Sequence, residues 1–143
     1  MAGVQKRLVR AAVALNVRVY RASGGRLMGR VHGVPLLLLS VAGRQSGVTH
    51  TTPLSYFGDR GRFVVAGSDA GAPLEPQWFR NLRRADCAAI QVGSRRYDVT
   101  ISIAGAEERT LLMRQLTARV PFFAQYLQTV TREIPLAVLT PTS

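Results

Sequence analysis

The sequence is poor in acidic residues, histidine and cysteine. Its 143 residues include 8 aspartates and glutamates, 2 histidines and 1 cysteine, and no acidic residue precedes Asp59. A single cysteine excludes an intrachain disulfide, and without a CxxC pair or a Cys/His cluster no metal site is predicted. This cysteine usage indicates a reducing compartment. Cys87 begins an apolar run, so we expect a buried and unreactive thiol there.

Long apolar runs are also missing. Basic side chains interrupt every apolar stretch near the N-terminus before it could form a signal-peptide core, and no run is long enough to span a bilayer. The length and the 47% hydrophobic content suit one buried core. We therefore expect a single-domain cytoplasmic protein.

What the sequence does contain is arginine. The formal net charge is +11, and all of the 19 basic residues except Lys6 are arginines. Many of them lie before Asp59 without an acidic neighbour, which predicts an anionic partner for this part of the chain. Specific nucleic-acid binding is not expected, because the aromatic residues do not alternate with arginines and no helix-turn-helix or RNP-like pattern occurs.

The N-terminal segment has the pattern of a basic amphipathic helix over residues 4–21. On a helical wheel one apolar stripe stands opposite the basic residues. The apolar stripe comprises Val4, Leu8, Ala12, Leu15 and Val19, and the basic face comprises Lys6, Arg7, Arg10, Arg18 and Arg21. Such a helix either packs its apolar stripe on the rest of the domain or lies on the anionic inner face of the cell membrane. We assign residues 1–30 to this helix and its loop, and residues 31–143 to the main domain.

Short strands separated by turn signals dominate the rest of the chain. Val34–Val41 has the apolar pattern of a strand buried on both faces. Turns at Asp59-Arg60-Gly61 and Gly93-Ser94 predict two hairpins. The further predicted strands are 50–57, 62–67, 88–92, 96–103 and 136–140. Helices are predicted over 76–85 and 107–120, with an extension over 121–129. The predicted buried face of the helix over 107–120 comprises Leu111, Leu112, Gln115 and Leu116. Consecutive hairpins without βαβ alternation predict a mostly β fold with flanking helices, an antiparallel barrel.

One turn carries candidate binding chemistry. Gly43-Arg44-Gln45-Ser46-Gly47 joins two predicted strands, and its glycines allow backbone N–H groups to converge on an anion. Arg44 adds a bidentate contact for phosphate and Ser46 a hydroxyl donor. Alone, such a turn is better explained by hairpin geometry, because many hairpins carry the same residues.

The turn is followed by further motifs in a distinctive order. They are Thr51-Thr52-Pro53-Leu54, Gly71-Ala72-Pro73, Pro76, Trp78, Asn81-Leu82 and Arg132-Glu133-Ile134-Pro135. From about Leu36 to Pro141 the chain resembles the deazaflavin-dependent nitroreductase family. The resemblance implies a split β-barrel of the pyridoxamine-oxidase-like, FMN-binding type. It also implies coenzyme F-420, an 8-hydroxy-5-deazaflavin with a phosphate-bearing, polyglutamylated tail.

The resemblance also implies roles for individual residues. Arg44, Gln45, Ser46 and Gly47 would cradle the cofactor phosphate and tail, with His50 nearby. Ser68 and Asp69 would lie beside the deazaflavin ring, and Ser68 and Tyr126 are the candidate catalytic residues. For Trp78 and Asn81, packing and a helix cap explain the signature just as well as a functional role, and for Trp78 the structural role is favoured. For Phe122, Phe123 and Tyr126 a pocket wall and an ordinary core face are equally compatible with the spacing.

The chain departs from the family pattern at three positions. Gln45 replaces a usual lysine, His50 a common arginine, and Phe123 a tyrosine of active nitroreductases. Each lost cation weakens the hold on the tail by about 1.5–3 kcal/mol if the contact is buried. The expected function is hydride transfer from reduced coenzyme F-420 to a lipophilic acceptor such as a quinone or nitroaromatic. The alternative functions are those of a non-catalytic lipid or fatty-acid binder and of an FMN-binding protein. The protein could form a homodimer with any of these functions.

Overall fold

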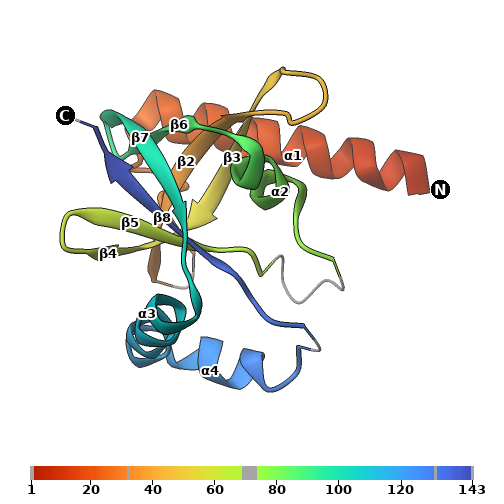
Figure 1. The fold of residues 1–143 in the computed structure, drawn as a ribbon. Coiled ribbons are helices and arrows are strands. Elements are labelled where there is room, and N and C mark those ends of the chain that lie inside the picture. The colour runs from red at the N-terminus through yellow and green to blue at the C-terminus, as the bar shows by residue number, and fades with distance from the viewer. Residues whose placement is uncertain (1, 32, 69–73, 131, 143) are drawn as a thin grey trace.

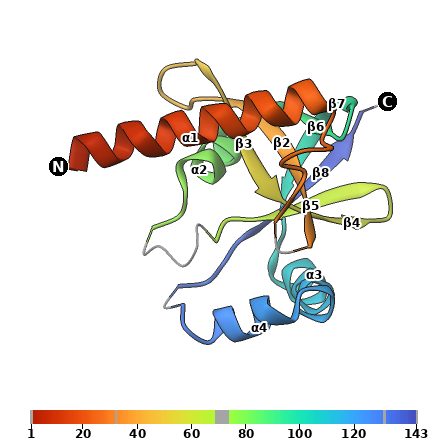
Figure 2. The same ribbon diagram turned by 180° about the vertical axis from the view of Figure 1, so that it is seen from behind.

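A computed structural model describes residues 2–31, 33–68, 74–130 and 132–142, and within these ranges the side chains of 2–7 and 31 are excluded. Strands curl into a barrel, α1 (Ala2–Ser23) crosses one side of it, and α3 (Ala106–Arg119) and α4 (Pro121–Leu127) cover one end (Figures 1 and 2). The short helix α2 (Gln77–Arg84) lies beside the barrel wall. The predicted β fold with flanking helices is confirmed, and the helix bounds agree within a few residues.

The strands of the described chain form one antiparallel sheet. Its order is β1-β2-β6-β7-β8-β5-β4, and β3 pairs with the other edge of β2. The strands are β1 (Arg30–Val31), β2 (Val34–Ala42), β3 (Thr49–Ser55), β4 (Phe57–Asp59), β5 (Arg62–Ala66), β6 (Cys87–Val92), β7 (Arg95–Ile103) and β8 (Leu136–Pro141). Every pairing is antiparallel, as the consecutive hairpins of the sequence predict.

Turn chemistry fixes the hairpins. Arg60 and Gly61 have φ of 55° and 79°, the left-handed pair that a tight two-residue hairpin requires, and they join β4 to β5. The strand predicted over 50–57 is divided, because its first part pairs with β2 and its end pairs with β5. Tyr56 lies at the division, where its backbone N–H donates to Pro35 O at 3.2 Å. This break directs β3 and β4 to different neighbours.

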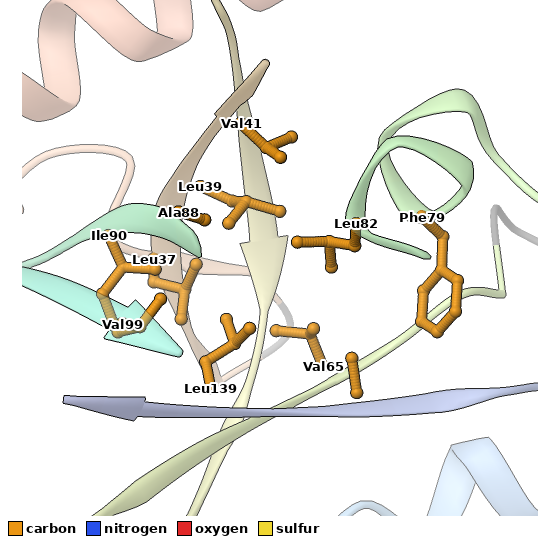
Figure 3. Packing of buried hydrophobic residues seen from close by; sticks show 11 residues of the cluster. Leu37, Leu39, Val41, Val65, Phe79, Leu82, Ala88, Ile90, Val99 and Leu139 are labelled. Carbon is orange, nitrogen blue, oxygen red and sulfur yellow. The ribbon is translucent and has the colours of Figure 1, made fainter. Parts of the chain in front are cut away.

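Two apolar clusters fill the interior. The larger lies inside the barrel and extends to Phe79 and Leu82 of α2 (Figure 3). The smaller packs α3 against the outer side of β5 and β8 through Leu112 and Leu116. Leu111 was predicted on this buried face but is 58% exposed, because Leu112 and Leu116, four residues apart, already define the contact. Leu37, Leu38 and Leu39 are all buried, which confirms that the centre of β2 is covered on both faces.

Helix α1 packs through a stripe that the sequence did not predict. Val13, Val17 and Tyr20 contact Leu36 and Leu38 on β2. In contrast, Leu8 and Leu15 of the predicted stripe are 65% and 60% exposed. The predicted packing stripe is therefore wrong, because the helix has two apolar stripes and the C-terminal one meets the barrel. Leu8, Ala12 and Leu15 of the other stripe are exposed, and Val19 is half-buried.

The Tyr20 hydroxyl fastens α1 to two strands. It is 1% exposed, donates to Leu36 O at 2.9 Å and accepts from Gly93 N at 2.8 Å. We expect Tyr20→Phe to lower the free energy of unfolding by about 1–3 kcal/mol, because it removes the partner of a buried backbone N–H. Urea unfolding measures this loss, with Tyr97→Phe as a half-buried control that should change less. Equal losses in the two variants would contradict the role of this hydroxyl.

Cys87 was predicted to be buried and is exposed. The strand was predicted from residue 88, but β6 begins at Cys87, and its buried run begins one residue later at Ala88. Alternation along a strand explains the difference, because residue 87 and residue 88 point to opposite faces.

Candidate functional site

The Gly43–Gly47 turn is the loop of the β2–β3 hairpin, at the end of the barrel opposite α3 and α4 (Figures 1 and 2). Gly47 has a φ of 73° and donates its N–H to Gly43 O at 2.9 Å, and Gly43 N–H donates to Val48 O at 2.8 Å. Ser46 Oγ accepts from Val48 N at 3.1 Å. Within the described residues the N–H groups of Gln45 and Ser46 donate to no protein acceptor. Hydrogen bonds within the turn thus fix its shape, and the backbone N–H groups of Gln45 and Ser46 remain available as donors.

Helix α2 holds Arg44 in place. Asn81 Oδ1 accepts from Arg44 N at 3.1 Å and from Arg44 Nη1 at 2.8 Å, and Gln77 Oε1 accepts from Arg44 Nη2 at 2.8 Å. Asn81 is 6% exposed, so its amide is a fixed part of the interior. Both acceptors are neutral amides. They orient the guanidinium without cancelling its charge, and the remaining donors can bind an anion.

A neighbouring arginine shows the opposite arrangement. Arg83 Nε and Nη2 donate to the two carboxylate oxygens of Glu75 at 2.9 and 2.8 Å. These hydrogen bonds hold the pKa of Glu75 below its ordinary value and raise that of Arg83. The bidentate pair is internally neutralised. Arg44 has no carboxylate partner within the described chain, so its charge stays available to a ligand.

Residue 43 must be small for the turn to adopt this shape. A Cβ at Gly43 would lie 2.8 Å from Ser46 Oγ and 3.4 Å from His50 Nε2. The hydroxyl and the imidazole therefore both border the space above Gly43. Together with Arg44 they form a small polar cradle whose donors fit a phosphate. Gln45 is exposed in the same turn.

A cavity of about 600 Å³ opens at the other end of β3. None of its lining residues in the described chain is charged, and most are apolar or aromatic. Its volume and lining are those of a site for a planar organic molecule. The lining residues come from β2 to β5 and from α2, α3 and α4: Val34, Thr52, Pro53, Leu54, Ser55, Tyr56, Phe57, Val64, Ala66, Ser68, Trp78, Leu116, Val120, Phe122, Phe123 and Tyr126.

Two structural elements connect the turn to the cavity. On β3, His50 borders the turn and Thr52 lines the cavity, and alternation places these two side chains on one face. On α2, Gln77 binds Arg44 and the adjacent Trp78 lines the cavity. A molecule with an anionic end and a planar end could contact both along these elements.

The two predicted catalytic residues meet at the cavity wall. Tyr126 Oη donates to Ser68 O at 3.2 Å, and Arg132 Nη2 donates to Ser68 O and Gly67 O, both at 3.0 Å. Gly67 N donates to Pro135 O at 2.9 Å. The Arg-x-Ile-Pro segment and α4 therefore clamp the end of β5. Tyr126 and Ser68 are both half-buried and line the cavity.

The aromatic residues of α4 form a wall of the cavity. Phe122 is 51% exposed, Phe123 is half-buried, and the Phe123 and Tyr126 rings are 5.3 Å apart at 38°. Within α4 no residue is fully buried, which argues against an ordinary core face. Of the predicted site residues, only Asp69 lies outside the described residues.

Sequence reasoning missed the role of α2. A helix cap was one of the two interpretations of Asn81, but its side chain makes no cap and binds Arg44 instead. Gln77 was not considered. The available signal was a buried amide on a short helix, because such a group requires hydrogen-bond partners from another element.

Comparison with known proteins agrees with this geometry. The fold is that of the split-barrel, pyridoxamine oxidase-like proteins. The model of the F-420H(2)-dependent quinone reductase family matches residues 12–141. The chain belongs to this family, which confirms the suspected kinship, and F-420 is the cofactor that the family indicates.

Relatives with this activity in their names come from Mycobacterium tuberculosis. One that bears the family name is 35% identical over 108 residues, covering 76% of this chain and 91% of its own. A second, named an F-420H(2)-dependent quinone reductase, is 29% identical over 130 residues, covering 88% and 87%. Among solved structures, an F-420H2-dependent reductase aligns with a TM-score of 0.66 at 25% identity, over 73% of this chain and 93% of that one.

More distant structures show the fold alone. A pyridoxamine 5′-phosphate oxidase-like protein of Listeria innocua aligns with a TM-score of 0.52 at 8% identity, over 76% of this chain and 84% of that one. A protein described as a domain-swapped dimer aligns with a TM-score of 0.67 at 23% identity, over 94% and 98%. The predicted split-barrel fold is confirmed.

Proposed function

We propose that this protein reduces quinones, with reduced coenzyme F-420 as the hydride donor. The observation that carries the proposal is the pairing of a charged turn with an uncharged cavity along β3 and α2. A quinone is a neutral, planar and lipophilic acceptor, which suits a lining without charged groups. Bound F-420H2 supplies the hydride.

We assign the anionic part of the cofactor to the turn. Arg44 would bind the phosphate, since its guanidinium is oriented by two neutral amides and keeps its charge. Ser46 and His50 would add polar contacts beside Gly43, and the open N–H groups of Gln45 and Ser46 would complete the cradle. Gly47 would keep the turn in its left-handed conformation.

Ser68 and Tyr126 would act at the acceptor. Reduction of a quinone to a hydroquinone takes up one hydride and one proton. The Tyr126 hydroxyl lies at the cavity wall and could deliver the proton to a quinone oxygen, with water restoring it. Ser68 would orient the acceptor through its hydroxyl or its N–H. The aromatic wall of Phe122 and Phe123 would exclude water from the reacting faces.

A Tyr126→Phe variant tests the catalytic assignment. We expect oxidised F-420 to bind the variant with nearly unchanged affinity in a fluorescence titration. Reduction of menadione by F-420H2, followed anaerobically, should slow by about tenfold or more because a positioned proton donor is lost. A rate equal to that of the parent protein would remove Tyr126 from catalysis. Failure of the parent protein to reduce any quinone would overturn the proposed function.

We further propose that α1 places the protein on the inner face of the membrane. Leu8, Val9 and Leu15 are 65%, 62% and 60% exposed on α1, and Arg10 and Arg18 are exposed beside them. An exposed apolar stripe flanked by cations suits an anionic bilayer surface, which would also be the source of a lipophilic quinone. No helix of the described chain is long and apolar enough to cross a membrane.

A double substitution separates membrane contact from packing. Leu8→Ser with Leu15→Ser should reduce co-sedimentation with vesicles of anionic lipid several-fold, since it removes the side chains expected to insert. The melting temperature should hardly change, because neither side chain is buried. The parent protein should show weaker binding to neutral vesicles. Equal binding of the parent and the variant to anionic vesicles would contradict the membrane proposal.

A further inference from the structure

A second cavity, of about 510 Å³, lies on the side of the barrel where α1 ends. It is bordered by the loop after α1, by Pro35 and Leu36 of β2, and by Val92 and Gly93 at the β6–β7 turn. The catalytic assignments above use none of these residues. Tyr56 is the one lining residue that the two cavities share.

The mouth of this cavity is cationic. Arg26 and Arg30 line it and are exposed, and among the described residues that line it none is acidic. Arg30 Nη1 donates to Gly33 O at 2.8 Å, a bond that places the guanidinium without neutralising it. Two guanidinium groups without a carboxylate make the cavity favourable for an anion.

The inner wall combines apolar groups with the hydroxyl of Tyr56. Leu36, Val92 and Pro35 are half-buried there, and Leu27 and Met28 extend the apolar surface to the mouth. The Tyr56 hydroxyl makes no hydrogen bond with another described residue. Burial is the main cause that raises the pKa of Tyr56 above its ordinary value, so the hydroxyl is a donor at neutral pH.

The loop that forms the mouth is firmly built. Leu36 N donates to Gly29 O at 2.8 Å, and Leu27 N donates to Ser23 Oγ at 3.0 Å. Met28 has a φ of 59°, a left-handed conformation that is unfavourable for a long side chain. A bulky residue held in this conformation at the rim of a cavity motivates a functional explanation.

We propose that this second cavity binds a single-chain amphiphile with an anionic head group. Arg26 and Arg30 bind the head, and the apolar wall of Leu36 and Val92 contacts the chain. Such a ligand would contact Tyr56 from the side opposite the catalytic cavity, so the two sites are neighbours without sharing a ligand. The site stands independently of the reduction chemistry.

Calorimetric titration with decanoate, below its micelle concentration, tests the proposal on the full chain. We expect saturable 1:1 binding to the parent protein. Arg26→Gln with Arg30→Gln should weaken it by about tenfold or more, since charge-assisted contacts are lost. Arg84→Gln with Arg114→Gln is the matched control, because these exposed arginines lie on α2 and α3 and the net charge changes equally. The control should bind like the parent.

Two further arms define the ligand chemistry. Decyl phosphate replaces decanoate to distinguish a phosphate head from a carboxylate head, and binding of either one that depends on Arg26 and Arg30 supports the site. Decanol, which has the same chain without charge, should bind at least about tenfold more weakly. Tyr56→Phe should weaken binding of the anion but retain the 1:1 ratio. Equal affinities of the parent and the Arg26/Arg30 variant, or equal affinities for decanol and decanoate, would overturn the proposal.

Discussion

Arg44→Ala should weaken binding of oxidised coenzyme F-420 by about ten- to a hundredfold, which corresponds to the loss of about 1.5–3 kcal/mol for a charge-assisted contact. The side chain is exposed, and its contacts are with two neutral amides of α2, so the fold should survive its removal. Fluorescence quenching of the cofactor measures the affinity. Arg114→Ala, on the exposed face of α3, removes the same charge and should have little effect.

Asn81→Asp provides a sharper form of the same test. The carboxylate would still accept from Arg44, so the guanidinium would remain in position, but its charge would be neutralised as that of Arg83 is by Glu75. We expect cofactor affinity to fall while the melting temperature stays near that of the parent protein. If both Arg44→Ala and Asn81→Asp bind F-420 normally, the phosphate does not occupy this turn.

Phe79→Ala should lower the free energy of unfolding by about 3–5 kcal/mol, the range for truncation of a fully buried phenylalanine. The ring is 0% exposed, packs edge-on against Trp78 at 5.4 Å and lies under the Arg83 guanidinium at 5.0 Å. It also fills the space beside Gly67, where a Cβ would lie only 2.8 Å from the ring. Urea unfolding gives the change in stability.

This substitution should also impair cofactor binding. Phe79 anchors the helix that carries Gln77 and Asn81, and a loosened α2 would no longer hold Arg44. Phe122→Ala is the control for stability, because that ring is 51% exposed and its truncation should cost far less. A loss below about 1 kcal/mol for Phe79→Ala would mean that α2 is not anchored by this residue.

The sequence predicted most of the strands and the Gly43–Gly47 turn for reasons that are local. Short apolar runs and turn residues such as Arg60-Gly61 determine hairpins over a few positions, and the structure places them as expected. The family resemblance suggested separate roles for Ser68 and Tyr126, but their contact could not be predicted, because 58 residues separate them in the chain.

The incorrect predictions concern which face of a helix packs against the barrel. On α1 two apolar stripes compete, and only the surface of β2 decides that Val17 and Tyr20 are buried while Leu8 and Leu15 are not. Similarly, Asn81 becomes part of the site only through its contact with Arg44, 37 residues away. Periodicity identifies an amphipathic helix, but the partner surface is information that a single sequence does not contain.

The side chains that hold Arg44 and those that form the aromatic wall of the cavity come from separate parts of the chain. Arg44 is oriented from α2, whereas the aromatic wall comes from α4, a helix with no fully buried residue. Substitutions at the exposed positions of α4 should therefore cost little folding stability and leave the contacts of Arg44 in place. Phe122 and Phe123 are the α4 residues at which a change of side chain would alter the shape of the cavity without removing Tyr126.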